Sequence, residues 1–194
     1  MPSLVPPAVA PGSLAALTQP ELRSGDLHLR PWDPADRDAV VAAYADPAIR
    51  RWHCRSMTAA EAGAWLAGWP DRWRAESGAG WAVVDRGAVA GQISLRRIVL
   101  AEGRAEVSYW VLPAARGRGI AGRALSALTG WAFRTARLHR IELNHSTANP
   151  ASCRVAGRAG FAAEGVKRSE ALHADGWHDM HLHARLATDG RVTA

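Results

Sequence analysis

The chain has 194 residues, of which 48% are hydrophobic and 22% are charged. This composition supports one packed domain of ordinary size and excludes a globally disordered chain. The formal net charge is +6 and the pI is about 10.5, which favours an anionic ligand or surface. The basic residues are scattered and form no block of the kind that binds nucleic acid. No apolar stretch is long enough for a transmembrane helix.

The two cysteines, Cys54 and Cys153, lie far apart and form no disulfide framework, so we expect a reducing cytoplasmic location. Three of the eight histidines (His178, His181, His183) lie on or near the last predicted strand. Carboxylates and cysteines at metal-binding spacing are missing, so the sequence predicts no metal. Residues 1–22 lack a basic segment and are interrupted by prolines, which predicts a flexible extension and no signal peptide. A domain over 23–187 and a tail over 188–194 are expected to follow.

The first elements are a strand over 27–30 and a helix that begins at Asp33-Pro34, an N-cap followed by proline, and runs to about Ala45. Asp46-Pro47 is expected to end that helix. Thr58 and Glu61 form a capping-box pattern that predicts a second helix. Its apolar face carries three tryptophans at helical spacing, and Pro70 is expected to break or kink it.

The spacing of apolar residues then changes to the alternation typical of strands. Strands are expected over 81–84, 89–98 and 105–112. A long helix is predicted from Ile120 to about Arg137, then a strand over 141–144 and a helix that opens at Asn149-Pro150. Strands over 161–166 and 177–186, joined by a loop over 169–176, complete the order. Strands beside helical crossovers predict an α/β (α+β mixed) fold, with a mixed, mostly antiparallel sheet of about seven strands and helices on both faces.

The stretch from Val107 to Ala121 is the most informative one in the chain. An apolar strand stops at Pro113, a basic glycine-rich turn follows over 116–119, and Ile120 opens a helix. The first helical N–H groups have no intrahelical partner and favour an anion, while glycines allow phosphates to approach closely. The pattern is neither a Walker A loop nor a dinucleotide fingerprint. It predicts a ligand that carries a pyrophosphate.

Residues 116–121 match the pattern Arg-x-x-Gly-x-Ala, which resembles the acetyl-CoA loop of the GCN5-related N-acetyltransferase (GNAT) superfamily, in the branch of the ribosomal-protein N-terminal acetyltransferases. Three further segments are similar to that family: the opening strand at 27–32, the Glu-Val-Ser-Tyr-Trp-Val strand at 106–111, and Asn-Pro-Ala-Ser at 149–152 followed by Gly160-Phe161. The four matches occur in the family's order and cover about residues 22–187. The resemblance implies the GNAT fold.

The resemblance also implies a co-substrate, acetyl-CoA or another short acyl-CoA, without a metal. The backbone of Trp110 and Val111 would pair with the pantetheine arm. Asn149 would bond the pantetheine, and Ser152 would lie near the thioester sulfur; from the residues alone, Asn149 is equally a helix N-cap and Ser152 a first-turn residue. The amides expected to hold the pyrophosphate are those of Arg116, Gly117, Arg118, Gly119, Ile120 and Ala121.

Direct attack of an amine on the thioester requires a base, a donor for the oxyanion and a proton for the leaving thiolate. Glu106 is the first candidate base, with an ion-paired strand residue as the alternative, and His145 is the second. The chain departs from its relatives at Asn144, where several carry a glutamate, and at Ala156, where many carry a tyrosine acid. The thiolate proton would then come from Ser152, from water or from the amine.

The acceptor implied by the resemblance is a protein N-terminus or a small-molecule amine. We expect Trp52 and His53, in the loop between the first two helices, to contact it together with Glu106 and Asp179. Two alternatives are a non-catalytic acyl-CoA-binding or sensor domain and a basic nucleic-acid-binding module, although no nucleic-acid or membrane partner is expected. A homodimer is possible.

Overall fold

An eight-stranded sheet forms the centre of the computed structural model, which describes residues 4–190. The strands are β1 (Leu22–Ser24), β2 (Leu27–Pro31), β3 (Gly78–Asp85), β4 (Ala88–Val99), β5 (Arg104–Val111), β6 (Arg140–Ser146), β7 (Ala162–His173) and β8 (Gly176–Leu186). Their spatial order is β1-β2-β3-β4-β5-β6-β8-β7. Among the strands of residues 4–190, only β5 and β6 pair in parallel. The predicted mostly antiparallel mixed sheet is therefore confirmed, with the short β1 as an additional strand.

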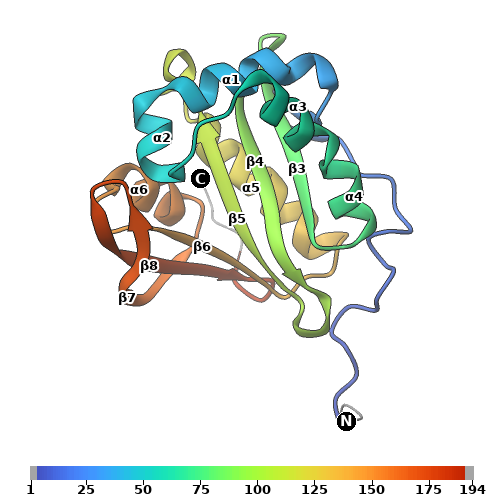
Figure 1. Ribbon diagram of the computed structural model, residues 1–194. Coiled ribbons are helices and arrows are strands. Elements are labelled where there is room, and N and C mark those ends of the chain that lie inside the picture. Colours follow the sequence, from blue (N-terminus) through green and yellow to red (C-terminus); the bar gives the residue numbers. More distant parts are fainter. Residues whose placement is uncertain (1–3, 191–194) are drawn as a thin grey trace.

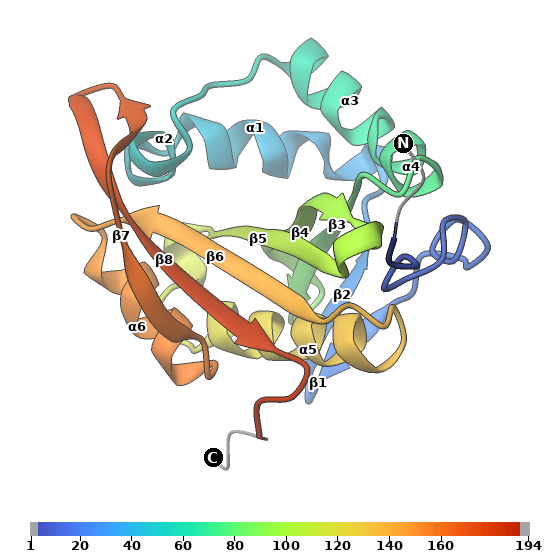
Figure 2. The same cartoon turned by 90° about the horizontal axis from the view of Figure 1, so that it is seen from below.

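Helices cover both faces of the sheet. They are η1 (Pro34–Asp36), α1 (Arg37–Ala45), α2 (Pro47–His53), α3 (Ala59–Ala67), α4 (Trp69–Arg74), η2 (Leu100–Glu102), η3 (Pro113–Ala115), α5 (Ile120–Arg134) and α6 (Pro150–Arg158). Figure 1 shows α1 to α4 around one side of the sheet, and Figure 2 shows α5 and α6 on the other. No helix of residues 4–190 is long and apolar enough to cross a membrane.

Local sequence chemistry accounts for most helix starts. Thr58 forms the predicted capping box, and Asp33, predicted as an N-cap, forms one as well; in both, the side chain of the third helical residue also bonds the cap backbone. The expected break occurs at Gly68, between α3 and α4, and Pro70 occupies the first turn of α4. The apolar side of α5 buries Leu125 and Leu128 completely beneath the sheet. This buried face fixes the position of the long helix that follows the glycine-rich turn.

Asp46-Pro47 behaves differently from the prediction, because it starts a helix as well as ending one. The Asp46 side chain accepts a hydrogen bond from the Ile49 amide at 2.9 Å, and Pro47 occupies the first turn of α2. This is the same N-cap and proline arrangement that opens the first helix at Asp33-Pro34. Trp52 and His53 therefore lie on α2 and not in a loop.

The N-terminal segment also differs from the flexible extension expected from its composition. Residues 4–21 have no helix or strand, yet Val9 and Leu14 are buried in the main core. The Glu76 carboxylate accepts the amides of Gly12, Leu14 and Ala15. Apolar anchors and a fixed anion thus hold the segment against the domain. Residues 1–3 and 191–194, at the ends of the expected extension and tail, lie outside the described residues.

Candidate active site

The parallel strands β5 and β6 part midway along their length. Their register runs from Arg104 opposite Arg140 only to Glu106 opposite Glu142. Beyond that point β5 stays paired with β4 up to Val111, whereas β6 stays paired with β8 up to Ser146 (Figure 1). A cavity of about 600 Å³ lies where they separate, lined by both strands and by α2, α5 and α6. The strand edges facing it are therefore available to an extended ligand.

The glycine-rich turn and the start of α5 form one wall of this cavity. Gly117 and Gly119 have φ angles of +77° and +69°, a conformation that side chains disfavour, which explains the glycines. Gly119 is the N-cap of α5 and offers no side-chain cap to the first helical amides. Ile120, Ala121 and Gly122 line the cavity. The open end of a fifteen-residue helix thus faces the cavity and can bind an anion there.

The two arginines of the turn have different surroundings. Arg116 lines the cavity, and its guanidinium pairs with Asp46 at 3.0 Å while Nε donates to the Val111 carbonyl. The Arg118 side chain pairs with the buried Asp85 and does not line the cavity. Two cavity-lining arginines that the sequence analysis missed, Arg154 and Arg158, come from α6.

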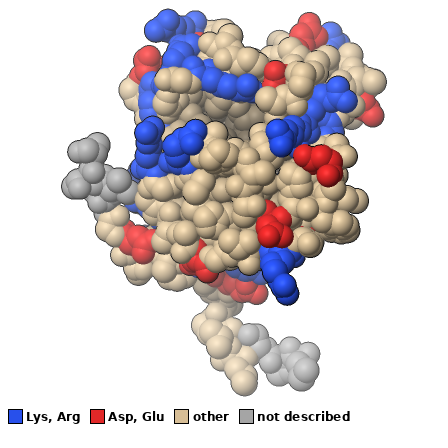
Figure 3. Space-filling view, turned by 90° about the vertical axis from the view of Figure 1, so that its left-hand side faces the viewer, with Lys and Arg blue, Asp and Glu red and all other residues tan. Residues whose placement is uncertain are grey.

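Figure 3 views the side of the molecule that lies to the left in Figure 1, and most Lys and Arg side chains visible there lie in the upper half of that face. The large cavity is lined by Arg55, Arg96, Arg116, Arg154 and Arg158. None of the described residues that line it is Asp or Glu. Its electrostatics therefore favour an anionic ligand.

A pair of hydroxyls lies at the α6 side of the cavity. Asn149 caps α6 by accepting the Ser152 amide at 3.1 Å. The Ser152 hydroxyl is in turn hydrogen-bonded to the Tyr109 phenol at 2.8 Å. Burial raises the pKa of Tyr109 to about 12, and the Ser152 hydrogen bond opposes that rise only in part. Tyr109 therefore keeps its proton at neutral pH.

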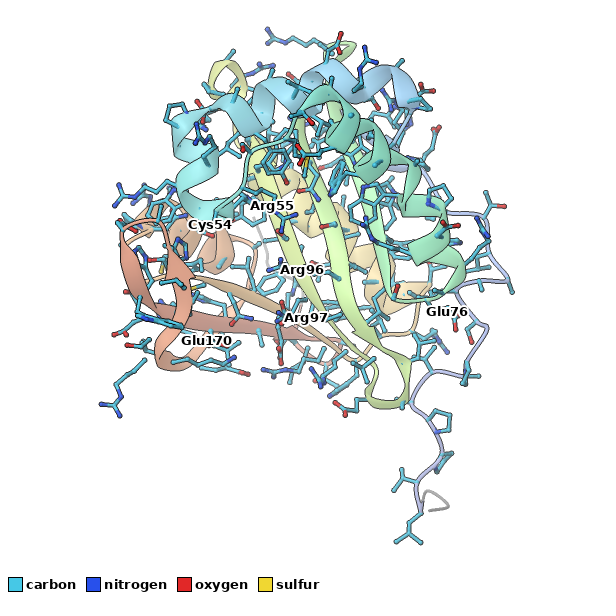
Figure 4. All side chains as sticks on the ribbon, viewed as in Figure 1. Cys54, Arg55, Glu76, Arg96, Arg97 and Glu170 are labelled. Atoms are coloured by element: carbon cyan, nitrogen blue, oxygen red, sulfur yellow. The ribbon has the colours of Figure 1, made fainter. Side chains whose placement is uncertain are left out.

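A smaller cavity of about 200 Å³ adjoins the first and shares His53, Arg55, Arg96 and Ser108 with it. Among the described residues, it too is lined by no carboxylate. His53 lies between the two, and its Nε2 donates to the Tyr109 carbonyl at 3.1 Å. Burial lowers the pKa of His53 to about 4, so the imidazole is neutral. Figure 4 shows Arg55, Arg96 and Arg97 in a column along the front of β4 and β5.

Two residues expected to contact the acceptor do not line either cavity. The buried Glu106 carboxylate accepts a hydrogen bond from Arg97 at 2.7 Å and lies 3.5 Å from Arg96 Nε. Asp179 on β8 is exposed and accepts the Ser169 amide at 2.8 Å, which fixes an irregular turn of β7. That irregularity lets β7 continue to His173, so most of the loop expected over 169–176 is a strand.

Other predicted residues do lie together in the large cavity. Trp52 and His53 line it from α2, and His145 lines it from β6. His145 Nδ1 donates to the Ser146 carbonyl at 2.8 Å, while its Nε2 is buried without a partner among residues 4–190. Burial lowers the pKa of His145. The cavity-lining residues predicted from the glycine-rich turn and its two flanking segments are Trp110, Val111, Arg116, Gly117, Gly119, Ile120, Ala121, Asn149 and Ser152.

Comparison with known proteins places this geometry in a known family. Residues 26–162 match the acetyltransferase (GNAT) domain family. A ribosomal-protein-serine acetyltransferase of Escherichia coli is 37% identical over 97 residues, which are 50% of this chain and 54% of that protein. The chain thus spans about half the length of the curated relatives it matches.

Solved structures agree with this assignment. Mycobacterium smegmatis RimJ in complex with CoA-disulfide has a TM-score of 0.78 and 26% identity, over 87% of this chain and 86% of that one. RimL, a ribosomal L7/L12 alpha-N-protein acetyltransferase in complex with coenzyme A, has a TM-score of 0.81 and 20% identity, over 86% of this chain and 98% of that one. At that lower identity, the second likeness supports the fold alone.

Proposed function

Because the chain belongs to the GNAT acetyltransferase domain family, we propose that it is an N-acetyltransferase that uses acetyl-CoA and acylates a primary amine by direct attack. The observation that carries this proposal is the cavity that opens where β5 and β6 part and ends at the uncapped amides of α5. An extended arm with a pyrophosphate at one end matches both features.

In this proposal the pantetheine arm of acetyl-CoA runs along the free edge of β5 beside Trp110 and Val111. The amides of residues 116–121 hold the pyrophosphate, and Arg154 and Arg158 add positive charge from α6. Arg118 contributes its backbone, since its side chain is paired with Asp85. Asn149 and Ser152 then lie at the thioester end.

The Tyr109–Ser152 hydroxyl pair is the proposed proton source for the leaving thiolate. Tyr109 retains its proton at neutral pH, and its hydrogen bond to Ser152 allows a proton to pass from the phenol through the serine hydroxyl. This takes the place of the tyrosine that relatives carry at the position of Ala156. Tyr109 reaches Ser152 from β5, whereas Ala156 lies on α6.

We propose that Glu106 acts as a positioning residue. Its carboxylate holds Arg97 and Arg96, and Arg96 lines both cavities. The arginines around the smaller cavity disfavour a bound ammonium, because like charges repel. The acceptor amine is therefore more easily deprotonated there, and water can accept its proton without a lining carboxylate.

The same arginines define the acceptor proposed here: the α-amine of a protein or peptide N-terminus that carries acidic residues close behind it. Arg55, Arg72 and Arg96 line the smaller cavity, with no acidic side chain among the described residues that line it. Similar proteins are named as ribosomal-protein acetyltransferases, which supports a protein N-terminus. A small amine with acidic groups is the alternative acceptor of the same chemistry.

The test is transfer of radiolabelled acetyl from acetyl-CoA to two synthetic peptides with the same first residue. One carries acidic residues at positions two to five, and the other carries lysines there. We expect acetylation of the acidic peptide with a kcat/KM at least about tenfold higher. A preference for the basic peptide contradicts the proposed acceptor. Acetyl-CoA binding without transfer to any amine supports the acyl-CoA-binding alternative.

A further inference from the structure

Four metal-ligating side chains meet beside the large cavity, outside the parts assigned to acetyl-CoA. They come from three elements: His145 on β6, Cys153 on α6, and His181 and His183 on β8. One ligand atom from each lies within 4.8 Å of all the others. The register places His145 opposite His181. We call these four residues the Cys-His cluster.

The spacing of the Cys-His cluster is close to that of a tetrahedral metal centre. Cys153 Sγ lies 3.9 Å from His181 Nδ1 and 3.8 Å from His183 Nε2. A tetrahedral zinc ion with ordinary Zn–S and Zn–N bonds separates sulfur and nitrogen by about 3.5 Å. Cys153 Sγ is thus a few tenths of an ångström too far from each of these nitrogens. The other ligand pairs lie within 4.8 Å, so they need to contract by at most about 1.5 Å, which rotation of the side-chain torsions supplies.

The protonation state of His145 also suits a ligand. Its Nδ1–H donates to the Ser146 carbonyl, which leaves the lone pair of Nε2 free. That Nε2 is buried without a hydrogen-bond partner among the described residues, and the whole side chain is only 6% exposed. A buried polar atom without a partner is costly, and metal coordination removes the cost. Packing of the imidazole rings alone does not satisfy it.

We propose that the Cys-His cluster binds one Zn²⁺ ion with all four protein ligands. Three imidazoles and one thiolate form a donor set that suits zinc. Four protein ligands leave no open position, so the ion is structural and does not activate water. On binding, the Cys153 thiol loses its proton to solvent and the sulfur forms the bond to zinc, with no change of oxidation state.

This ion joins α6 to β6 and β8. Because α6 also carries Asn149 and Ser152, zinc holds the thioester end of the acetyl-CoA site in place. His145 Nε2 then binds zinc and is not the amine's base. The sequence analysis predicted no metal because Cys153 lies 28 residues from His181 along the chain, and only the fold brings them together.

The test uses the full chain, purified without a histidine tag and stripped of metal by a chelator. Titration with Co²⁺ as a spectroscopic probe is expected to give one bound ion per chain, with the visible bands of a tetrahedral site and a thiolate charge-transfer band. Titration with Zn²⁺ is expected to displace the cobalt and to raise the melting temperature. Absence of the thiolate band, or binding without a fixed stoichiometry, overturns the proposal.

Substitutions in the Cys-His cluster test which side chains bind the metal. Cys153→Ser and His183→Gln are each expected to weaken Zn²⁺ binding by at least about 100-fold. Cys54→Ser removes the exposed thiol and serves as the matched control, with wild-type affinity expected. Circular dichroism checks that each variant folds, and His181→Gln replaces any that does not. Equal affinity in the folded variants and the control contradicts the assignment, whatever the acetylation activity.

Discussion

Replacing Glu106 by glutamine tests whether its carboxylate positions arginines or removes the amine's proton. The change keeps the shape of the side chain but removes the charge that pairs with Arg97 and Arg96. Because the Glu106 side chain is only 11% exposed, the lost charge-assisted hydrogen bond should cost about 1–3 kcal/mol of unfolding free energy. For a chain of this size, each kcal/mol lowers the melting temperature by about 2–4 °C.

The kinetic expectation follows from the position of Glu106 outside both cavities. We expect KM for the acidic peptide to rise, because Arg96 is released, while kcat stays within about tenfold of the wild type. Loss of a general base lowers kcat by about 10²–10⁴-fold.

The assay is steady-state acetylation of the acidic peptide across pH 6 to about 9, with melting temperatures measured in parallel. Glu142→Gln is the matched control, because Glu142 lies opposite Glu106 on β6 and also pairs with an arginine. A different result would refute the positioning role and identify Glu106 as the base. In that result, Glu106→Gln lowers kcat more than about 100-fold and abolishes the pH dependence of kcat, while KM and the melting temperature stay unchanged.

Three further outcomes are expected. Tyr109→Phe should lower kcat by about 10²-fold with little change in KM for acetyl-CoA, and an unchanged kcat in stopped-flow and steady-state assays contradicts its role as proton donor. Gly80→Ala places a Cβ 2.5 Å from a tryptophan ring and should cost about 1–3 kcal/mol in denaturant unfolding, whereas Gly63→Ala on α3 meets open space and should be neutral or stabilising. His53 has a pKa near 4 when folded and about 6.5 when unfolded, so between these values only the unfolded chain binds the proton at His53. The free energy of unfolding should therefore fall as pH decreases, with His53 contributing up to about 1.4 kcal/mol per pH unit. His53→Gln should make that slope shallower, although His145 and His183, whose pKa values burial also lowers, still contribute; an identical slope in the variant contradicts the neutral buried state.

Features set by neighbouring residues could be predicted from the sequence. The N-cap at Asp33, the capping box at Thr58 and the glycine-rich turn before Ile120 each depend on contacts within a few residues, and the structure has them where the patterns indicate. The cavity position of Asn149 and Ser152 followed from the family resemblance. The start of α2 at Asp46 used the same local chemistry and could have been predicted too.

Features that depend on contacts between segments far apart in the sequence could not be predicted from the sequence. The hydrogen bond between Tyr109 and Ser152 joins residues 43 positions apart. Arg154 reaches the cavity only because α6 lies against the parted strands. The partners of Glu106 are on β4, and its side-chain direction depends on strand register, which a single sequence determines poorly.

The central claim is that acetyl-CoA binds where β5 and β6 part, against the first turn of α5. Gly122 lies in that turn, lines the cavity and has an ordinary helical backbone, so Gly122→Trp fills the cavity without backbone strain. Gly157→Trp on the exposed side of α6 is the matched control, since its Cβ also meets open space. Calorimetric titration with acetyl-CoA should show tight binding to the wild type and Gly157→Trp, and at least about 100-fold weaker binding to Gly122→Trp. Equal affinity of the two variants would contradict this account.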